Sequence, residues 1–277
     1  MSTIWARERA ESHPKEQPKL HLKHVTRLFQ TPNGPLTALD DISLNVAEGE
    51  FLCLVGPSGC GKSTLLKGVA GFMPPTAGRI QLNGKPVTGP GPDRMMVFQE
   101  FDQLLPWKTV RQNVLFPMLT SGRFQGAEAE EKARLYIDKV NLTQFADIYP
   151  HMLSGGMKQR VAIARAMAME PDILLMDEPF ASLDALTRQK MQEELLQLWD
   201  DIRFTVLFVT HSIEEAIIVG NRILVLSAHP GQVRAELNAH EYGHTNLGGE
   251  NFVRLQQRIH NMLFAERVEE EQVMKHE

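Results

Sequence analysis

The chain has 277 residues, 43% of them hydrophobic, and a formal net charge of −5 with an isoelectric point near 6.1. A chain of this length buries a sizeable core, as one large domain or as a domain with a subdomain. The acidic balance argues against a general nucleic-acid binder, so we expect no nucleic acid among its partners. The two cysteines, Cys53 and Cys60, provide no disulfide framework and predict a reducing, cytosolic compartment.

The first 19 residues alternate charges and lack an apolar centre, so 1–19 is predicted to be a disordered polar arm rather than a signal peptide. No apolar run approaches the ~18 residues that a membrane span requires, which predicts a chain that is soluble by itself. We expect one domain over 20–240, with a helical subdomain at about 104–169, and a helical tail over 241–277.

Short apolar runs alternate with helical patterns along the chain, which predicts an α/β fold with a mainly parallel sheet. One helix contains MQEELLQLWDDI, because its apolar residues recur at spacings of 4, 3 and 4. From about Val110 to Met169 the pattern is helical. After Gly231 the chain is polar and turn-rich, and it becomes helical again from Phe252 to about Arg267. The predicted strands are Phe51–Val55, Met95–Phe98, Ile173–Met176, Val206–Val209 and Ile223–Leu226.

The segment GPSGCGKST follows the first of these strands and precedes the helical TLLKGVA. It fits G-x-x-x-x-G-K-[ST], a loop whose backbone N–H groups and helix N-terminus hold phosphate. Lys62 is expected to reach the β- and γ-phosphates, and Ser63 to offer its hydroxyl to Mg²⁺. A glycine-rich turn that matches by accident is the alternative. The expected nucleotide contacts are Gly56, Pro57, Ser58, Gly59, Cys60, Gly61, Lys62, Ser63 and Thr64.

Cys60 lies inside this loop, where a helix N-terminus lowers a thiol pKa. A redox role is one interpretation, and a tolerated small residue is the favoured one.

The apolar run ILLM ends in Asp177 and Glu178. A buried parallel strand places them at the carboxyl edge of the sheet, where ligands of α/β proteins bind. Asp177 is expected to hold Mg²⁺, and Glu178 to polarise an attacking water. A pair of solvated acids is the alternative, which a phosphate-binding loop in the same chain makes less attractive.

The octapeptide LSGGMKQR (153–160) places a serine cap and two glycines before an alanine-rich helix. Alone it is an ordinary loop-to-helix turn. Together with the other two motifs it resembles the signature of the ATP-binding cassette (ABC) ATPases, over roughly Leu20 to Val233. The resemblance implies a P-loop NTPase fold, a RecA-like mainly parallel sheet with an N-terminal antiparallel β region and an inserted α-helical subdomain.

The resemblance also implies roles for further residues. Gln99 matches the glutamine that senses Mg²⁺ and the γ-phosphate, His211 matches the switch histidine, and Ser182-Leu183-Asp184 matches the D-loop. Phe29 stands where an aromatic ring stacks on adenine, with a core position as its alternative. Glu178, His211 and Gln99 are therefore the expected catalytic residues, with ATP and Mg²⁺ as cofactors. Nucleotide contacts are also expected from Ser154, Gly155, Gly156, Gln159 and Asp184, and the signature loop of each chain is expected to complete the ATP site of the other.

In this family two ATPase chains pair head to tail. The resemblance therefore implies a homodimer, separate transmembrane permease subunits, an indirectly linked solute-binding protein, and a peripheral place on the cytoplasmic side of the inner membrane. A finer resemblance, carried by VFQE, LLPWKTV, MKQR and LSAHPG, is to nitrate, sulfonate and taurine importer ATPases. A P-loop kinase or GTPase, or an ABC module of a non-transport complex, are the alternatives.

Two smaller patterns complete the predictions. The apolar cluster Phe101, Leu104, Leu105, Pro106 and Trp107 is expected to contribute a surface for a permease, and the alternative is that it seals the insertion against the core. His229, His240 and His244 are read as polar loop residues rather than metal ligands, because no cysteine or acidic residue has ligand spacing beside them.

Overall fold

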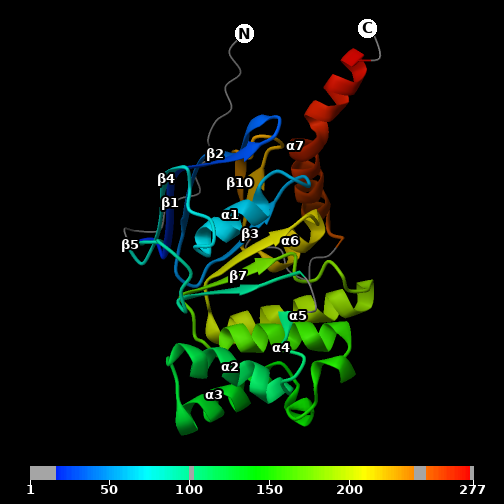
Figure 1. Ribbon diagram of the computed structural model, residues 1–277. Coiled ribbons are helices and arrows are strands. Elements are labelled where there is room, and N and C mark those ends of the chain that lie inside the picture. Colours follow the sequence, from blue (N-terminus) through cyan, green and yellow to red (C-terminus); the bar gives the residue numbers. More distant parts are fainter. Residues whose placement is uncertain (1–16, 100–102, 240–247, 275–277) are drawn as a thin grey trace.

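A computed structural model describes residues 17–99, 103–239 and 248–274, with side chains of the last segment described to residue 264. All but the end of the predicted arm lies outside these ranges. Two sheets and seven α-helices within them organise the fold (Figure 1). The boundaries 20–240, 104–169 and 241–277 stay predictions.

The larger sheet has six strands in the order β10-β9-β3-β8-β7-β6, and all neighbours are parallel except β10 and β9. The predicted mainly parallel sheet is therefore confirmed, and the ends of its predicted strands differ from the observed ends by at most one residue. Its members are β3 (Phe51–Val55), β6 (Arg94–Val97), β7 (Ile173–Asp177), β8 (Val206–Thr210), β9 (Arg222–Leu226) and β10 (Val233–Asn238).

Strand β10 corrects the expectation that the chain after Gly231 is only turn-rich. Leu237 is its one buried residue, and the strand lies at the edge of the sheet. An edge strand needs backbone hydrogen bonds to a single neighbour, so a polar sequence forms it without the apolar pattern that predicts a core strand.

The smaller sheet confirms the antiparallel region expected near the N-terminus. Its order is β2-β1-β4-β5, from β1 (Leu20–Thr31), β2 (Gly34–Val46), β4 (Ala77–Leu82) and β5 (Lys85–Pro86).

Successive side chains of β3 point to opposite faces of the sheet and belong to two separate apolar clusters. Phe51, Cys53 and Val55 belong to one apolar cluster, while Leu52 and Leu54 belong to the other. A strand with apolar residues on both faces is buried between two layers, as parallel strands usually are. Helix α1 (Lys62–Val69) fills the second cluster together with the antiparallel sheet, and Figure 1 shows it between the two sheets.

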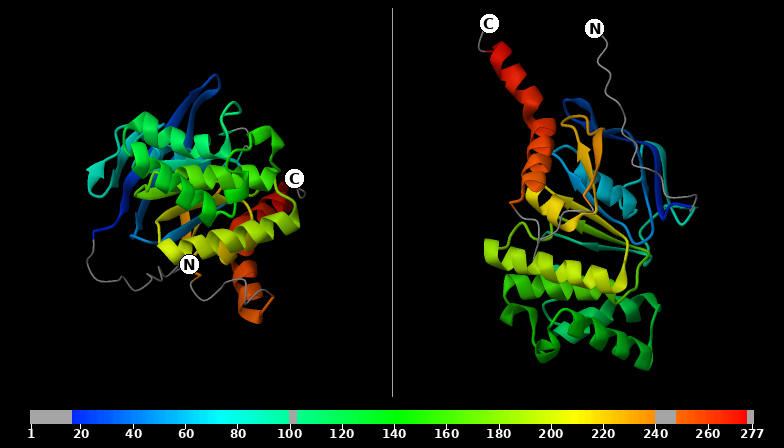
Figure 2. Two further views of the ribbon diagram at one scale, coloured as in Figure 1. Left: turned by 90° about the horizontal axis from the view of Figure 1, so that it is seen from below. Right: turned by 180° about the vertical axis from the view of Figure 1, so that it is seen from behind.

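Only helices and turns lie between α2 and α4, at the end of the molecule remote from the antiparallel sheet (Figures 1 and 2). They are α2 (Val110–Ser121), α3 (Gly126–Lys139), two 3₁₀ turns (Thr143–Phe145 and Pro150–Met152) and α4 (Gly155–Met167). Helix α5 (Ala185–Ile202) packs beside α4, and buries the predicted face through Met191, Leu195 and Leu198.

Helices α6 (Ile213–Val219) and α7 (Glu250–Met274) pack against each other and against the sheet. The helix predicted from Phe252 to about Arg267 is therefore present and longer than expected. Buried residues Phe252, Leu255, Ile259 and Leu263 recur at helical spacing, which explains why this part of α7 lies on the body of the protein. Among the described helices, none combines the length and the apolar character needed to cross a bilayer.

Candidate nucleotide and catalytic site

Four predicted site segments follow four strands that are neighbours in the sheet. The phosphate-binding loop follows β3, His211 follows β8, Glu178 follows β7, and Gln99 comes two residues after β6. Because β3, β8, β7 and β6 are parallel neighbours, their carboxyl ends meet at one edge of the sheet. The fold thus brings together residues that are far apart in the sequence, at the edge where α/β proteins bind ligands.

The phosphate-binding loop turns sharply from β3 into α1. Gly61 precedes the helix with a φ of 95°, a conformation that side chains other than glycine rarely adopt. A Cβ on Gly61 would also lie 2.7 Å from the carbonyl oxygen of Ala38. The loop is thus packed against β2, and its backbone amides precede the N-terminus of α1, where the helix dipole favours an anion.

Lys62 is nearly buried, with 5% of its surface exposed. Its ammonium group donates to the carbonyl oxygens of Gly56 at 2.7 Å and Pro57 at 2.9 Å. The positive charge therefore lies within the curve of the loop, where it can attract a phosphate.

Ser63 and Asp177 meet across the site. The Ser63 hydroxyl donates to Oδ1 of Asp177 at 2.9 Å. Burial raises the pKa of the Asp177 carboxyl and the charge of Glu178 adds to this, while the Ser63 hydrogen bond opposes both. A hydroxyl and a carboxylate are oxygen ligands of the kind that Mg²⁺ takes alongside the phosphates of a nucleotide. The two side chains fit that cation.

A metal site formed by protein side chains alone, without nucleotide phosphates, would need several ligating residues close together. Within the described ranges, no three His, Cys, Asp or Glu side chains are grouped to hold a metal ion. His240 and His244 lie outside those ranges.

Glu178 and His211, two of the predicted catalytic residues, lie in contact with each other. The ring nitrogen Nδ1 of His211 lies 2.7 Å from Oε2 of Glu178. Glu178 has a φ of 47° while its amide donates to Val209. A left-handed backbone at a non-glycine residue costs about 1–3 kcal/mol and is concentrated at functional sites. The turn directs the carboxylate toward the loop after β8.

Gln99 and Gln159 have different surroundings. Gln99 is exposed. Gln159 is fully buried in α4, where its amide nitrogen lies 3.4 Å from the carbonyl of Phe98 and its amide oxygen accepts from Gln103. Gln159 therefore joins α4 to the segment that carries Gln99, and its predicted contact with nucleotide stays a prediction. Gln103 was not predicted as part of this connection, because only the fold shows it.

The signature serine and the D-loop aspartate both begin helices. Ser154 caps α4 by accepting from the amide of Met157, and Asp184 caps α5 by accepting from the amide of Thr187. The hydrogen bonds from Thr187 lower the pKa of the Asp184 carboxyl. A Cβ on Gly156 would lie 2.9 Å from the Thr187 side chain, so the two helix starts pack closely. Among the described residues, no hydrogen bond joins Ser154 to the phosphate-binding loop.

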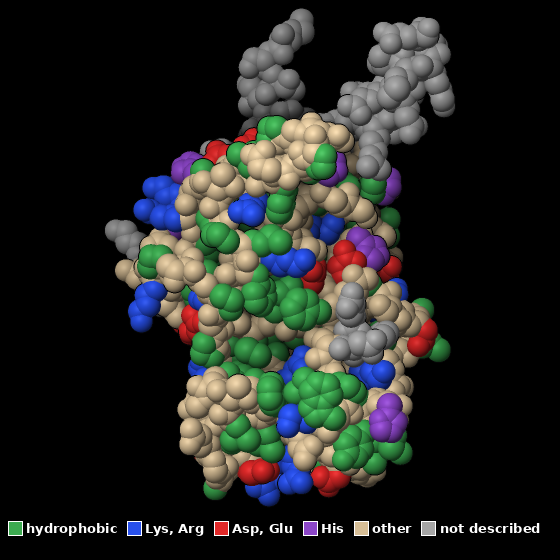
Figure 3. Space-filling model, viewed as in Figure 1, with side chains coloured by type: hydrophobic (Ala, Val, Ile, Leu, Met, Phe, Trp, Pro, Cys, Tyr) green, Lys and Arg blue, Asp and Glu red, His purple; other side chains and the backbone are tan. Residues whose placement is uncertain are grey.

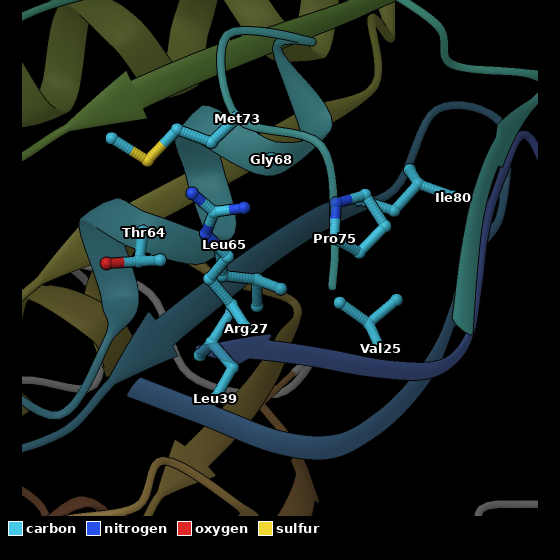
Figure 4. A pocket seen from close by; sticks show the side chains of 9 residues that line it. All are labelled: Val25, Arg27, Leu39, Thr64, Leu65, Gly68, Met73, Pro75 and Ile80. Carbon is cyan, nitrogen blue, oxygen red and sulfur yellow. The ribbon is translucent and has the colours of Figure 1, made fainter. Parts of the chain in front are cut away.

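Phe29 is half-buried on β1, and the guanidinium of Arg27 lies 4.9 Å from the centre of its ring. Arg27 donates to the carbonyl of Pro74 at 2.7 Å. Arg27 and Thr64 line the same small pocket between β1 and α1 (Figure 4). Phe29 is therefore not sealed in the core, and its stacking on adenine stays a prediction.

Cys60 is 1% exposed. Burial raises the pKa of its thiol, and the charge of Lys62 only partly opposes this. The structure favours the interpretation of Cys60 as a small packing residue, because a thiol reacts as the thiolate.

The family model described as "ABC transporter" matches residues 39–181. This chain belongs to the ABC transporter ATPases. It is 46% identical over 220 residues to the bicarbonate transport ATP-binding protein CmpD of Synechococcus elongatus, covering 79% of each chain. It is 45% identical over 219 residues to the nitrate import ATP-binding protein NrtD of the same organism, covering 79% of this chain and 80% of the relative. The predicted resemblance to nitrate importer ATPases is confirmed.

Solved structures of ABC cassettes share the fold. A dimeric post-hydrolysis cassette bound to ADP and phosphate is 33% identical, with a TM-score of 0.67 over 79% of this chain and 98% of that one. A cassette of Clostridium perfringens, from the transporter complex cbiONQ, is 27% identical with a TM-score of 0.73, over 89% of this chain and 99% of that one. The P-loop fold is confirmed, and the chain is an ATP-hydrolysing ABC transporter subunit.

Proposed function

We propose that the chain is the energy-coupling subunit of an importer for a small solute of the nitrate, bicarbonate or sulfonate class. The observation that carries this proposal is the identity of 45–46% to nitrate and bicarbonate transport subunits, over about four fifths of both chains. An ABC module of a non-transport complex is less well supported, since these relatives are named as transport proteins. The solute itself is selected by other subunits.

We assign different steps of ATP hydrolysis to different residues of the site. Lys62 and the loop amides bind the phosphates, and Ser63, Asp177 and Gln99 would hold Mg²⁺, which neutralises phosphate charge when bound. Glu178 accepts a proton from the attacking water. His211, 2.7 Å from the Glu178 carboxylate, orients that carboxylate and reaches toward the γ-phosphate.

Dimerisation is the second part of the proposal. Ser154, at the exposed start of α4, faces the ATP of a second copy, and the similar ADP-bound cassette is a dimer. Two copies then close around two ATP molecules and reopen after hydrolysis, at a peripheral position on the cytoplasmic side of the inner membrane.

The permease is proposed to dock on the loop before α2. Trp107 is 68% exposed, whereas Leu104, also in the predicted cluster, is buried. Phe101 lies outside the described residues. Trp107 and Phe116 belong to the apolar surface of the helical end of the molecule, and Figure 3 shows apolar and basic side chains gathered there.

Asn113 holds this loop in shape. It is fully buried, accepts from the amide of Leu105 at 2.8 Å, and donates to the carbonyls of Leu105 and Lys108 at 3.1 and 3.0 Å. The exposed Trp107 is therefore presented on a fixed backbone, which lowers the entropy cost of binding a partner helix. Large aromatic residues are frequent anchors in interfaces.

Uptake by cells tests the proposal. In a strain that lacks this chain, the wild-type chain should restore uptake of labelled nitrate, bicarbonate or taurine, and Glu178→Gln should restore none. Trp107→Ala should keep basal ATP hydrolysis and reduce uptake, whereas the matched change Phe72→Ala, at another exposed ring, should leave uptake unchanged. Equal uptake of all three solutes with and without the chain contradicts the importer function. Normal uptake by Trp107→Ala contradicts only the docking surface.

A further inference from the structure

Arg188 reaches back from the first turn of α5 to the segment that follows Glu178. Its Nε donates to the carbonyl of Phe180 at 3.2 Å, and its Nη2 to that of Leu183 at 2.8 Å, with the carbonyl of Ala181 3.5 Å away. A positive charge in the first turn of a helix is disfavoured by the helix dipole, by about 0.3–1 kcal/mol. Here the carbonyl oxygens stabilise that charge, and one guanidinium fixes the backbone of 180–183.

The next turn of α5 reaches a buried acid. Gln192 donates to Oε1 of Glu215 at 2.9 Å, and both side chains are 5% exposed. Burial raises the pKa of Glu215, while hydrogen bonds from Thr210 and Gln192 and the charges of Arg188 and His211 oppose the shift. Gln192 lies one turn after Arg188 on α5, and it is the residue through which this helix contacts Glu215.

Glu215 belongs to the helix that starts directly after the switch histidine. Its amide donates to Ser212, and the amide of Ser212 donates to the hydroxyl of Thr210, the last residue of β8. Helix α5 therefore contacts the segment 180–183 through Arg188 and, one turn later, Glu215 through Gln192, and the helix of Glu215 starts directly after His211. None of these groups is needed to bind phosphate or Mg²⁺.

We propose that Arg188 is a positioning residue, which holds the segment 180–183 on α5, the helix that Gln192 joins to Glu215 beside the His211 loop. The inference rests on the proposed function, because it takes the residues between Glu178 and Asp184 as a surface that meets the second copy. A movement of the His211 loop when the γ-phosphate binds or leaves would then move the segment 180–183, which contacts the partner. Closure of the dimer is then coupled to the nucleotide state of each site.

Substitutions at Arg188 separate this role from a structural one. Arg188→Gln should lower kcat at least ten-fold and leave the Kd for ATP, measured by equilibrium dialysis on the monomer, within two-fold. Arg188→Lys keeps the charge without the planar fork, so it should recover part of the loss. The control is Lys190→Gln, which removes a charge from the exposed face of the same helix and should leave kcat unchanged.

Two further measurements complete the test. In a Glu178→Gln background, Arg188→Gln should raise the Kd of the ATP-dependent dimer at least ten-fold. Hydrogen exchange should accelerate at the amides of 181–184 but not in β7 or β8. The combination with Glu215→Gln should cost less than the two single losses added together.

Failure of the Arg188 inference and failure of the proposed function give different results in these experiments. If Arg188→Gln matches Lys190→Gln in kcat and dimer formation, or if it loses ATP affinity and kcat in equal proportion, the inference is wrong. If the Glu178→Gln parent itself forms no ATP-dependent dimer, the proposed function is contradicted and this inference with it.

Discussion

The ring of His211 lies 2.7 Å from the Glu178 carboxylate, although the two residues are 33 positions apart in the sequence. The register of β7 and β8 produces this contact, because Asp177 pairs with Val209 and the two strands end side by side. The Glu178 carboxylate at the edge of the sheet is thus held by the loop that follows β8. The contact supports the proposal that Glu178, rather than its neighbour Asp177, activates the attacking water.

Lys62→Ala should weaken ATP binding about 10- to 100-fold, since hydrogen bonds to charged groups contribute about 1.5–3 kcal/mol. The variant loses the ammonium group that now lies inside the loop, 2.7 Å from the Gly56 carbonyl. Equilibrium dialysis with labelled ATP measures the effect, and Lys85→Ala on the exposed strand β5 is the control. ATP affinity equal to that of wild type would show that Lys62 only braces the loop.

Asp177→Asn should abolish Mg²⁺-dependent hydrolysis and yet raise the thermal midpoint at pH 7. The pKa of this carboxyl is raised in the folded protein, mainly by burial. The ionised carboxylate is therefore less stable in the folded than in the unfolded protein, and its ionisation lowers the free energy of unfolding. This penalty is absent well below the ordinary aspartate pKa of about 3.9. It grows as the pH rises through the raised folded pKa and is constant above it.

Thermal melts of wild type and Asp177→Asn across pH 3.5 to 7.5 check this sign. The stabilisation by asparagine should grow with pH and level off. A variant that is less stable than wild type at pH 7 would mean that the Ser63 hydrogen bond outweighs the burial penalty.

Ser154→Arg should prevent the ATP-dependent dimer, because it places bulk and charge where a second copy is proposed to bring its γ-phosphate. Ser154 also caps α4, and the loss of a cap costs about 1 kcal/mol. Ser154→Ala loses the cap without adding bulk, and is therefore the control that should still dimerise. Sedimentation velocity in a Glu178→Gln background reads the result, and dimers of Ser154→Arg at wild-type affinity are the contrary outcome.

Much of the site could be predicted because it depends on local sequence. Phe51–Val55 is apolar throughout and is followed at once by the loop, so a buried strand and its carboxyl end could both be located. The two acids at the carboxyl end of β7 and the serine before α4 could be located from the sequence in the same way. Strand β10 was missed because an edge strand tolerates polar residues, and Leu237 alone is buried there.

Other features depend on contacts between remote segments. Gln159 has the sequence context of a nucleotide contact, but it is buried beside Phe98, which only the packing of α4 on the sheet decides. The bonds from Arg188 to 180–183 and from Gln192 to Glu215 leave no pattern in the sequence either, since both polar residues have ordinary helical positions.

Glu178 is proposed to activate the water that attacks ATP bound between two copies of the chain. Glu178→Gln keeps the shape of the side chain but not its basicity. Mixing this variant with radiolabelled ATP and Mg²⁺, isolating the complex and analysing the bound nucleotide tests the claim in one sample. We expect a dimer that retains two intact ATP molecules and shows no measurable turnover, whereas bound ADP with hydrolysis at near wild-type rate would contradict the account.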